Sequence, residues 1–581
     1  MYEFLNSIRV PGFLYRRKNL NRFFLQAVGI LSLPILMTAA QPKTTLSDQQ
    51  GYRPGDSKNL EYGRFTDFRS SIKEFRELFA LMKMTLKHNQ VIFQGKTGPV
   101  SGFAAGSAYP QVWLRDAATI IPASKYLYDG SFLRSWLIEH LSYQKADGSL
   151  EDWIDSRGRS DKNTTETDQE TSAVLAAFQI SQISGPGWLK EKISGETVLA
   201  RLEKALLFVL NHRFDKAHGL VIGAHTADWG DVDMGHADEK AIYVDAETHW
   251  TCDIYDQSQF YGAARGLASM LSALGLSDRG RFWLEKGALL QKNTDKWLWR
   301  EDKGFYKVHI HLDGLRHDFA ENDMFAMGGN AEALLWGLAS EDKCPRIIEN
   351  ALVRQKVFNV STISGSLLPP YPKGFFKHPA MSDPYEYQNG GQWDWFGGKL
   401  ISAMFEHGFS REAREKLLEI AKKDLANRGL YEWDTPDGKG RGSAYYSGSA
   451  GSLAKALFEG YFGIKISPDS LALEPKLGKD SAVIHVYVPA AGIFAAYSYH
   501  WDRAEQKLTL GYNSNFQGQG KIKLLAPWFP PGLPADSGRI KIEAKRDGVA
   551  IPFRQFLLHN DKFIIIETDF KNHILEVHII R

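Results

Sequence analysis

The chain has few cysteines and no excess of charge of either sign. Only Cys252 and Cys344 occur among 581 residues. This excludes a disulfide framework, and neither cysteine has a metal-ligand companion at suitable spacing. One bridge in an oxidising compartment and two buried free thiols both fit the sequence. Lys and Arg number 70 against 68 Asp and Glu, so we expect no nucleic acid and no anionic membrane surface as a partner.

Long apolar runs are also scarce, and the single long run lies near the N-terminus. Residues 23–40 (FFLQAVGILSLPILMTAA) follow four basic residues and end in small residues, which is typical of a cleaved signal peptide. The run is near the lower length limit for a membrane span, so an uncleaved anchor stays open. We expect residues 1–40 to direct export of the chain to the periplasm or the medium. The alternative is that they anchor the chain in the membrane, with the rest of it outside the cytoplasm. Residues 41–64 read as a linker.

Residues 65–464 show apolar positions at helical spacing, and no repeat of fixed period is visible. Twelve helices are expected, starting near Thr66, Val112, Ser131, Asp168, Thr197, Asp256, Asp278, Gly329, Cys344, Gln392, Ser410 and Ser447. Taken in pairs they predict six hairpins, a mainly α (α/α)6 toroid. Three long loops rich in Gly, Asp, Trp and Pro, at 148–165, 221–251 and 365–391, are then expected to build a pocket at one end.

Residues 465–581 change to a strand pattern. Strands are expected at 481–488, 492–499, 507–511, 520–525, 539–544 and 563–568, with a tight turn at Asp547-Gly548 between two of them. The size suits a small C-terminal β-sandwich, packed on the barrel as a lid or a brace.

The chain is rich in aromatic residues, with 15 Trp and 23 Tyr, several of them in polar, Gly-rich stretches. Aromatic rings stack on the apolar faces of sugars, although a large barrel also holds many aromatics in its core. Hydrolysis of a glycosidic bond usually needs two carboxyl groups across the bond. We therefore searched the loops for carboxyl groups next to aromatic residues.

Two such clusters contain candidate catalytic residues. In ADWGDVD (227–233) the carboxyls of Asp228 and Asp231 flank Trp229, and an indole raises the pKa of a neighbouring carboxyl toward that of a general acid. A calcium loop or a plain acidic turn is the alternative. In LYEWDTPDGKGRGSAYYSGSAG (430–451) Glu432 lies between aromatic residues and suits a general base, unless it is a helix-end carboxylate without a role.

Two further clusters suit sugar binding. Trp113, Arg115 and Asp116 start a helix, where an Arg and an Asp can grip vicinal hydroxyls, although a structural salt bridge is the usual role of such a pair. YEYQNGGQWDWFGG (385–398) groups amides and indoles before a helix, as a binding wall or as a tightly packed joint. Its candidate residues are Asn389, Gln392 and Trp393, with Glu386 as the alternative base.

Taken in order, these motifs resemble the six-hairpin glycosidases, a superfamily that includes glucoamylases, trehalases, family 63, debranching glucosidases and inverting disaccharide phosphorylases. WLRD (113–116) is similar to the sugar-holding W-x-R-D element of glucoamylases. ADWGD (227–231) resembles the DWND segment of the phosphorylases, whose second Asp is the acid, which implies Asp231. The stretch around Glu432 resembles the base-bearing segment of family 63, and QNGGQW (388–393) is similar to a shared N-G-x-x-W element. Gly230 departs from the DWND pattern, and the β-domain follows the barrel, whereas several relatives carry theirs in front.

The resemblance implies an inverting, exo-acting glycoside hydrolase that releases a terminal sugar, with glucose expected, from an oligosaccharide or glycoside. Asp231 would be the acid and Glu432 the base, and Trp229 would join the sugar-binding residues. No cofactor or metal is expected. The open alternatives are a phosphorylase, a lyase or epimerase that uses Tyr or His as base (His225, His236 or His249 among the histidines), and a non-catalytic saccharide-binding protein.

Overall fold

The computed structural model describes residues 60–527 and 541–580. The expected signal or anchor segment, and most of the expected linker, lie outside the described residues. Within the described ranges, no helix combines the length and the apolar character that a membrane crossing requires.

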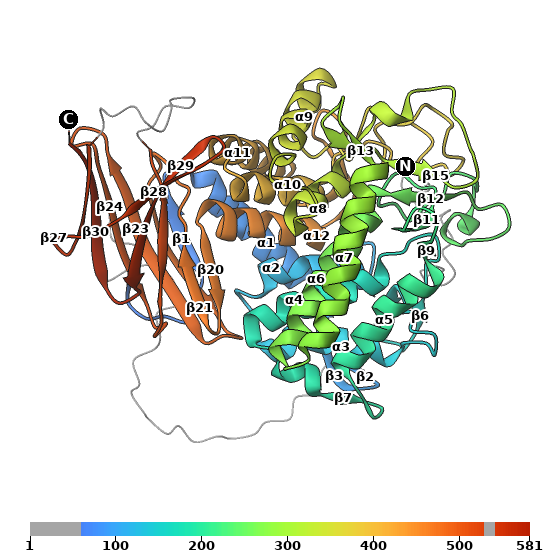
Figure 1. Ribbon diagram of the computed structural model, residues 1–581, viewed down its shortest axis with the longest axis horizontal. Coiled ribbons are helices and arrows are strands. Elements are labelled where there is room, and N and C mark those ends of the chain that lie inside the picture. The colour runs from blue at the N-terminus through green and yellow to red at the C-terminus, as the bar shows by residue number, and fades with distance from the viewer. Residues whose placement is uncertain (1–59, 528–540, 581) are drawn as a thin grey trace, which may run out of the picture.

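The described residues form twelve α-helices arranged in two concentric rings (Figure 1). The inner ring consists of α2 (Leu114–Ser124), α4 (Gln169–Ser184), α6 (Ile254–Ala273), α8 (Met327–Trp336), α10 (Asp394–Glu406) and α12 (Ser447–Ala454). Each inner helix contacts the next, and α12 contacts α2, so the ring is closed. The outer ring consists of α1 (Lys73–Asn89), α3 (Gly130–Ser142), α5 (Val198–His212), α7 (Ser277–Trp297), α9 (Cys344–Val357) and α11 (Ser410–Asn427). This is the (α/α)6 toroid that the sequence predicts.

The two rings differ in the way their side chains are buried. Most side chains of α6 are buried on every face, whereas α7 buries a few residues and exposes its charged positions. A helix that is apolar or small-residue-rich all round suits an interior position, and an amphipathic helix suits the outer layer. The sequence pattern of each helix therefore matches its ring.

Loops of unequal length make one end of the barrel different from the other. The long loops all lead into the N-termini of inner helices and carry short strands. These strands are β2 (Gln90–Gly95), β3 (Gly98–Phe103), β4 (Val112–Trp113), β5 (Trp153–Ile154), β6 (Ser160–Asp161), β9 (Phe214–Asp215), β10 (Leu220–Val221), β11 (Gly223–Ala224), β12 (Trp250–Asp253), β13 (Trp299–Arg300), β14 (Phe305–Tyr306), β15 (His309–His311), β16 (Phe325–Ala326), β17 (Leu367–Leu368), β18 (Tyr431–Asp434) and β19 (Gly440–Ala444). Shorter connections, one with the hairpin β7 (Lys192–Ile193) and β8 (Glu196–Thr197), join the helices at the other end.

The C-terminal part is a sandwich of two sheets (Figure 1). One sheet has the strand order β1-β22-β23-β24-β30-β26-β27, with β1 at Asp67–Ser70, and the other β20-β21-β25-β29-β28. The remaining strands are β20 (Ile464–Ser467), β21 (Ser470–Leu473), β22 (Ala482–Val488), β23 (Ile493–Asp502), β24 (Lys507–Ser514), β25 (Gln519–Leu525), β26 (Lys541–Arg546), β27 (Val549–Ala550), β28 (Arg554–Leu558), β29 (Asp561–Asp569) and β30 (His573–Ile580). The Asp547-Gly548 turn joins β26 to β27.

The sandwich braces the barrel at the C-terminal ends of the inner helices. Residues 465–470 and the last turns of α2, α4 and α6 line one cavity, and the Tyr497 hydroxyl donates to the Phe462 carbonyl at 2.8 Å. The long loops lie at the other end of these helices, so the sandwich is a brace and not a lid over the pocket.

One predicted helix start is wrong. The first helix begins at Lys73 and not near Thr66, because β1 precedes it and pairs with β22 of the sandwich. Phe68 on this strand is fully buried. The pairing partner lies near the other end of the chain, so no local pattern predicts it.

Candidate active site

A cleft opens among the loops that enter the inner helices. Its walls combine carboxyl groups, indoles, phenols and one amide. The lining residues are Ala105, Tyr109, Trp113, Arg115, Asp116, Trp229, Asp231, Tyr387, Gln388, Trp393, Glu432 and Tyr446. Trp113, Trp393 and Tyr446 are the N-cap residues of α2, α10 and α12, so the positive ends of three helix dipoles point toward the cleft.

Glu432 is buried and held on the hairpin of β18 and β19. The Tyr109 hydroxyl donates to its two carboxylate oxygens at 3.0 and 3.2 Å, and the Ser443 N–H donates to Oε2 at 2.8 Å. Gly442 has φ 66°, and a Cβ there would lie 2.4 Å from Glu432 Oε2. Glycine is therefore required beside this carboxylate.

The pKa of Glu432 is raised from its ordinary value to about 7. Burial is the main cause, because it disfavours the charged form. The Ser443 and Tyr109 hydrogen bonds oppose the rise, and the negative charges of Asp231 and Asp116 add to it. A carboxylate with this pKa can accept a proton near neutral pH.

Asp231 lines the same cleft from a different segment of the chain. The Gln388 side-chain amide donates to Asp231 Oδ1 at 2.7 Å, and Asn163 donates to the Asp231 backbone carbonyl at 3.1 Å. Gly230 lies under Gln388, where a Cβ would be 2.7 Å from Oε1 of that amide. A side chain at position 230 would therefore displace the Gln388 amide that bonds Asp231.

The indoles form the walls of the cleft. Trp229 and Trp393 pack edge to face with ring centroids 4.6 Å apart, and Trp393 Nε1 donates to the Tyr387 carbonyl at 2.9 Å. The Nε1 groups of Trp113 and Trp229 have no hydrogen-bond partner within the part of the chain that the structure describes. Both nitrogen atoms are buried, so the two indoles line the cleft with their carbon atoms.

Arg115 and Asp116 form the base of the cleft, and each is held by other groups. The Arg115 guanidinium contacts the carboxylate of Glu166 and lies 3.3 Å from that of Asp168. The Tyr446 hydroxyl donates to Asp116 Oδ1 at 2.8 Å. Burial raises the pKa of Asp116, and the charge of Arg115 opposes this rise. Both side chains line the cleft. Arg115 therefore forms a structural salt bridge and also belongs to the candidate site.

Asp228 is held between the N-terminal ends of two inner helices. Its Oδ1 accepts the Tyr255 N–H of α6 at 3.2 Å, and its Oδ2 accepts the Gly329 N–H of α8 at 2.8 Å. Burial raises its pKa to about 8, against the effect of these two N–H groups. Asp228 does not line the cleft, so it is not the acid that this geometry favours.

Three other predicted residues also lie outside the cleft lining. Asn389 is buried. Its Oδ1 accepts the Tyr371 N–H at 2.8 Å, and its Nδ2 donates to the Tyr371 carbonyl at 3.3 Å. Gln392 is buried, and its backbone pairs with that of Asp434, at the end of the strand that carries Glu432. Glu386 is exposed. The side-chain amides of Asn389 and Gln392 thus hold the loop, since the Gln392 Oε1 also accepts the Thr362 N–H at 2.8 Å. Glu386 does not line the cleft, so it is not placed to act as the base.

Sequence reasoning missed five cleft residues, namely Ala105, Tyr109, Tyr387, Gln388 and Tyr446. Tyr387 and Gln388 directly follow Glu386 in the 385–398 segment, which was an available signal, whereas Tyr446 in the 430–451 segment has no carboxyl beside it. Tyr109 lies in a loop without such a pattern. Asp152 was also missed; it is buried, neither of its oxygens has a partner among the described residues, and burial raises its pKa.

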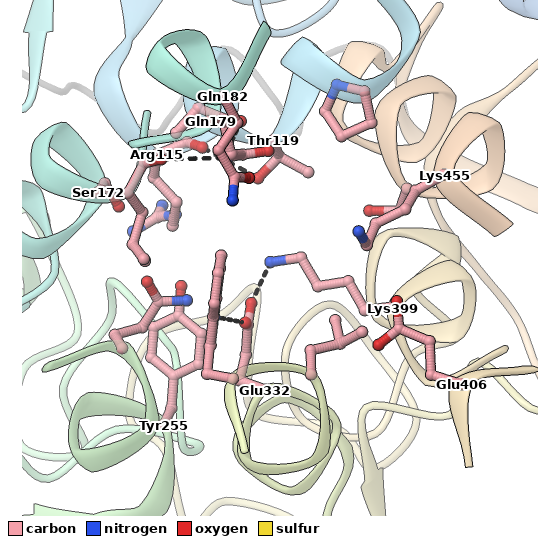
Figure 2. Close-up of a pocket in the computed structure, with 17 residues that line it drawn as sticks. Arg115, Thr119, Ser172, Gln179, Gln182, Tyr255, Glu332, Lys399, Glu406 and Lys455 are labelled. Carbon is pink, nitrogen blue, oxygen red and sulfur yellow. Dashed lines mark hydrogen bonds and ion pairs between the residues drawn. The ribbon is translucent and has the colours of Figure 1, made fainter. Parts of the chain in front are cut away.

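A second cavity follows the barrel axis between the six inner helices (Figure 2). Arg115 lines both cavities. Figure 2 shows Lys399 reaching Glu332 in an ion pair, and the Trp336 indole donates to the same carboxylate at 2.6 Å. The Glu332 carboxylate is thus engaged, whereas the candidate carboxyls Asp231 and Glu432 line the loop-end cleft.

Comparison with known proteins gives fold neighbours only. No protein-family model matches the chain, and no curated protein matches it. An α-L-rhamnosidase from Dictyoglumus thermophilum matches with a TM-score of 0.58 at 13% identity, over 88% of this chain and 50% of its own. A GH78 family rhamnosidase of Bacillus sp. GL1 matches with a TM-score of 0.56 at 14% identity, over 77% and 41%.

The chain has the six-hairpin toroid fold of these glycosidases. It spans half or less of the length of the two rhamnosidases. A GH63 mannosylglycerate hydrolase from Thermus thermophilus, in complex with glucose, matches with a TM-score of 0.49 at 16% identity, over 66% of this chain and 99% of its own. The two rhamnosidases resemble this chain in fold and not in sequence.

Proposed function

We propose that this six-hairpin chain is an inverting, exo-acting glycoside hydrolase that releases a terminal sugar from an oligosaccharide or glycoside. The observation that carries the proposal is that Asp231 and Glu432, from separate segments, line one cleft with aromatic walls. Glucose is the first sugar to test, as the sequence motifs suggest.

In this mechanism Asp231 donates its proton to the glycosidic oxygen while the bond from that oxygen to the anomeric carbon breaks. Glu432 accepts a proton from a water molecule, whose oxygen forms the new bond to the anomeric carbon from the opposite face. The Tyr109 and Ser443 donors hold the Glu432 carboxylate in one orientation. Gln388 fixes the carboxyl of Asp231.

The terminal sugar would lie between the indoles and the Asp116 carboxylate. The indoles of Trp113 and Trp229 line the cleft, and aromatic rings match the apolar faces of a pyranose. Asp116, held by Tyr446, would accept hydrogen bonds from sugar hydroxyls. Aromatic and charged groups in this arrangement favour a neutral, hydroxyl-rich ligand.

The cleft supports the alternatives less well. The cation that lines it, Arg115, is engaged by two carboxylates, which leaves a phosphate ion without a free cationic partner among the lining residues. None of His225, His236 and His249, the histidines considered as the base of a lyase or epimerase, lines the cleft. Export of the chain, which the N-terminal sequence predicts, is part of this proposal and is tested by cell fractionation.

The test is sugar release from a panel of glycosides by wild type, Asp231→Asn and Glu432→Gln. We expect both variants to lose more than about 100-fold in kcat while keeping the wild-type circular dichroism. Proton NMR of the first product formed should show the anomer inverted. Retention of the anomer would refute inversion, and turnover that requires phosphate would replace hydrolysis by phosphorolysis. Full activity of either variant would remove that residue from the mechanism.

A further inference from the structure

Four histidines surround one glutamate beside the segment that carries Asp231. His225 precedes that segment, His309 and His311 lie on β15, and His317 and Glu321 follow in the same loop. One ligand atom each from His225, His311, His317 and Glu321 lie within 4.8 Å of one another. No other role for this cluster follows from the proposed reaction.

Hydrogen bonding alone does not account for the cluster. The Tyr371 hydroxyl donates to Glu321 Oε1 and His311 Nε2 lies near Oε2, each at 2.7 Å. Three more imidazole nitrogens face the same Oε1: His225 Nε2 at 3.2 Å, and those of His309 and His317 at 3.4 Å. One carboxylate oxygen cannot accept four good hydrogen bonds, and charge-assisted bonds are usually about 2.7–2.9 Å long.

The longer distances match those between ligands of a four-coordinate metal ion. Imidazole and carboxylate ligands lie about 2.0–2.2 Å from Zn²⁺, so neighbouring ligand atoms in a tetrahedron are about 3.4 Å apart. The separations of 3.2 Å and 3.4 Å from Glu321 Oε1 to His225 and His317 agree with this spacing. The remaining separations are all within 4.8 Å.

The cluster is enclosed by buried and aromatic side chains. His225 and His309 have no exposed side-chain surface, and burial disfavours the charged imidazolium. Phe319 stacks on His317 with centroids 4.8 Å apart, and Phe375 packs against His225 at 5.5 Å. Nitrogen atoms with free lone pairs, in an apolar enclosure and next to one carboxylate, make a typical site for a transition metal.

We propose that His225, His311, His317 and Glu321 bind one divalent transition-metal ion, of which zinc is the best match. Three nitrogen ligands and one oxygen favour zinc over calcium and magnesium, which prefer all-oxygen sites. Four protein ligands describe a closed, structural site. Tyr371 and His309 support Glu321 from outside, through the 2.7 Å bond of the Tyr371 hydroxyl and its 3.1 Å contact with His309 Nδ1.

The ion would join the loop that carries Asp231 to β15 and its following turn. His225 is six positions before Asp231, and its carbonyl accepts the Met234 N–H at 3.1 Å. A fixed His225 therefore holds both ends of the loop around Asp231. The site acts by positioning and does not depend on the reaction class, so it can be tested even if the proposed hydrolysis is wrong.

The test measures metal content directly in the full chain. Purified protein is stripped with a chelator, equilibrated with zinc at micromolar free concentration, and assayed by inductively coupled plasma mass spectrometry. We expect about one zinc per wild-type chain, and less than a tenth of that in His225→Ala and Glu321→Gln. The matched control is His249→Gln, because His249 is a partly exposed histidine just before β12 that pairs with Asp313; it should bind zinc like wild type.

Cobalt substitution of the wild type covers the case in which a variant fails to fold. A tetrahedral nitrogen–oxygen site gives visible d–d bands without a thiolate charge-transfer band. A thiolate band would place the metal at the other candidate group, Glu341, Cys344 and His407, and overturn the proposal. Absence of bound zinc in wild type, or equal zinc in His225→Ala, would overturn it as well.

Discussion

The Tyr109→Phe variant offers a sharp test of Glu432 as the base. The Tyr109 hydroxyl contacts both carboxylate oxygens of Glu432, at 3.0 and 3.2 Å, and its hydrogen bond stabilises the ionised form. Removing it should raise the pKa of Glu432 above its value of about 7. A hydrogen bond to a charged group is worth about 1.5–3 kcal/mol.

The lower end of that range applies here, because the bond is shared between two oxygens and is not short. About 1.4 kcal/mol corresponds to one pKa unit. Since the base must be ionised, activity rises with pH through its pKa. Because the pKa of Glu432 is raised to about 7, we expect the acid limb of kcat/KM near pH 7 in wild type. In Tyr109→Phe this limb should move up by about one unit, with about tenfold less activity near pH 6 and little change near pH 9.

The assay is sugar release across about pH 5 to 9 at substrate concentrations far below KM. Tyr446→Phe is the matched control, because its hydroxyl donates to Asp116 and not to Glu432. That variant should leave the acid limb in place or lower it slightly. An acid limb that stays at its wild-type position in Tyr109→Phe, or that moves to lower pH, would refute Glu432 as the group that titrates.

Three further predictions concern the groups that position the two carboxyls. Gln388→Leu removes the donor to Asp231 and should lower kcat about 10- to 100-fold with little change in KM; an unchanged kcat in steady-state kinetics would reject this role. Gly442→Ala should abolish sugar release by displacing the base carboxylate, whereas Gly374→Ala, at a similar φ in open space, should keep activity. Asp228→Asn loses one of two backbone bonds and should lower Tm by several degrees with activity kept within about threefold; activity loss without a change in Tm would contradict its structural assignment.

The helices were predictable from sequence because their signal is local. Apolar spacing identifies α5 and α11 within one residue of their observed starts, and the closed ring follows from pairing twelve such helices. The strand β1 was not predictable, since its four residues carry no period and its partner β22 is distant in sequence. The strand β28 was missed because its residues are mostly exposed and its pairing with β29 defines it, whereas β30 (HILEVHII) contains alternating apolar and polar positions and was overlooked.

The sequence predicts which residue types belong to the site, but it does not predict which way their side chains point. A carboxyl between aromatic residues in a loop indicates a functional group, and both Asp231 and Glu432 lie in the cleft. Their catalytic roles stay predictions. Nothing in the sequence tells which way each side chain of a loop points, so Asp228 and Asn389 looked equally suitable and are bonded to backbone instead. Tyr109 could not be found, because it meets Glu432 only in the folded chain.

The pairing of β1 with β22 also sets an order of events during synthesis. The Thr66 hydroxyl donates to the carbonyl of Tyr487, 421 positions later, so β1 waits for most of the polypeptide before it finds its partner. Contacts of such long range form late in folding. A chain that stops after the barrel would leave β1 as an unpaired edge, which invites aggregation. We therefore expect chains that end before β22 to aggregate more readily than the full chain.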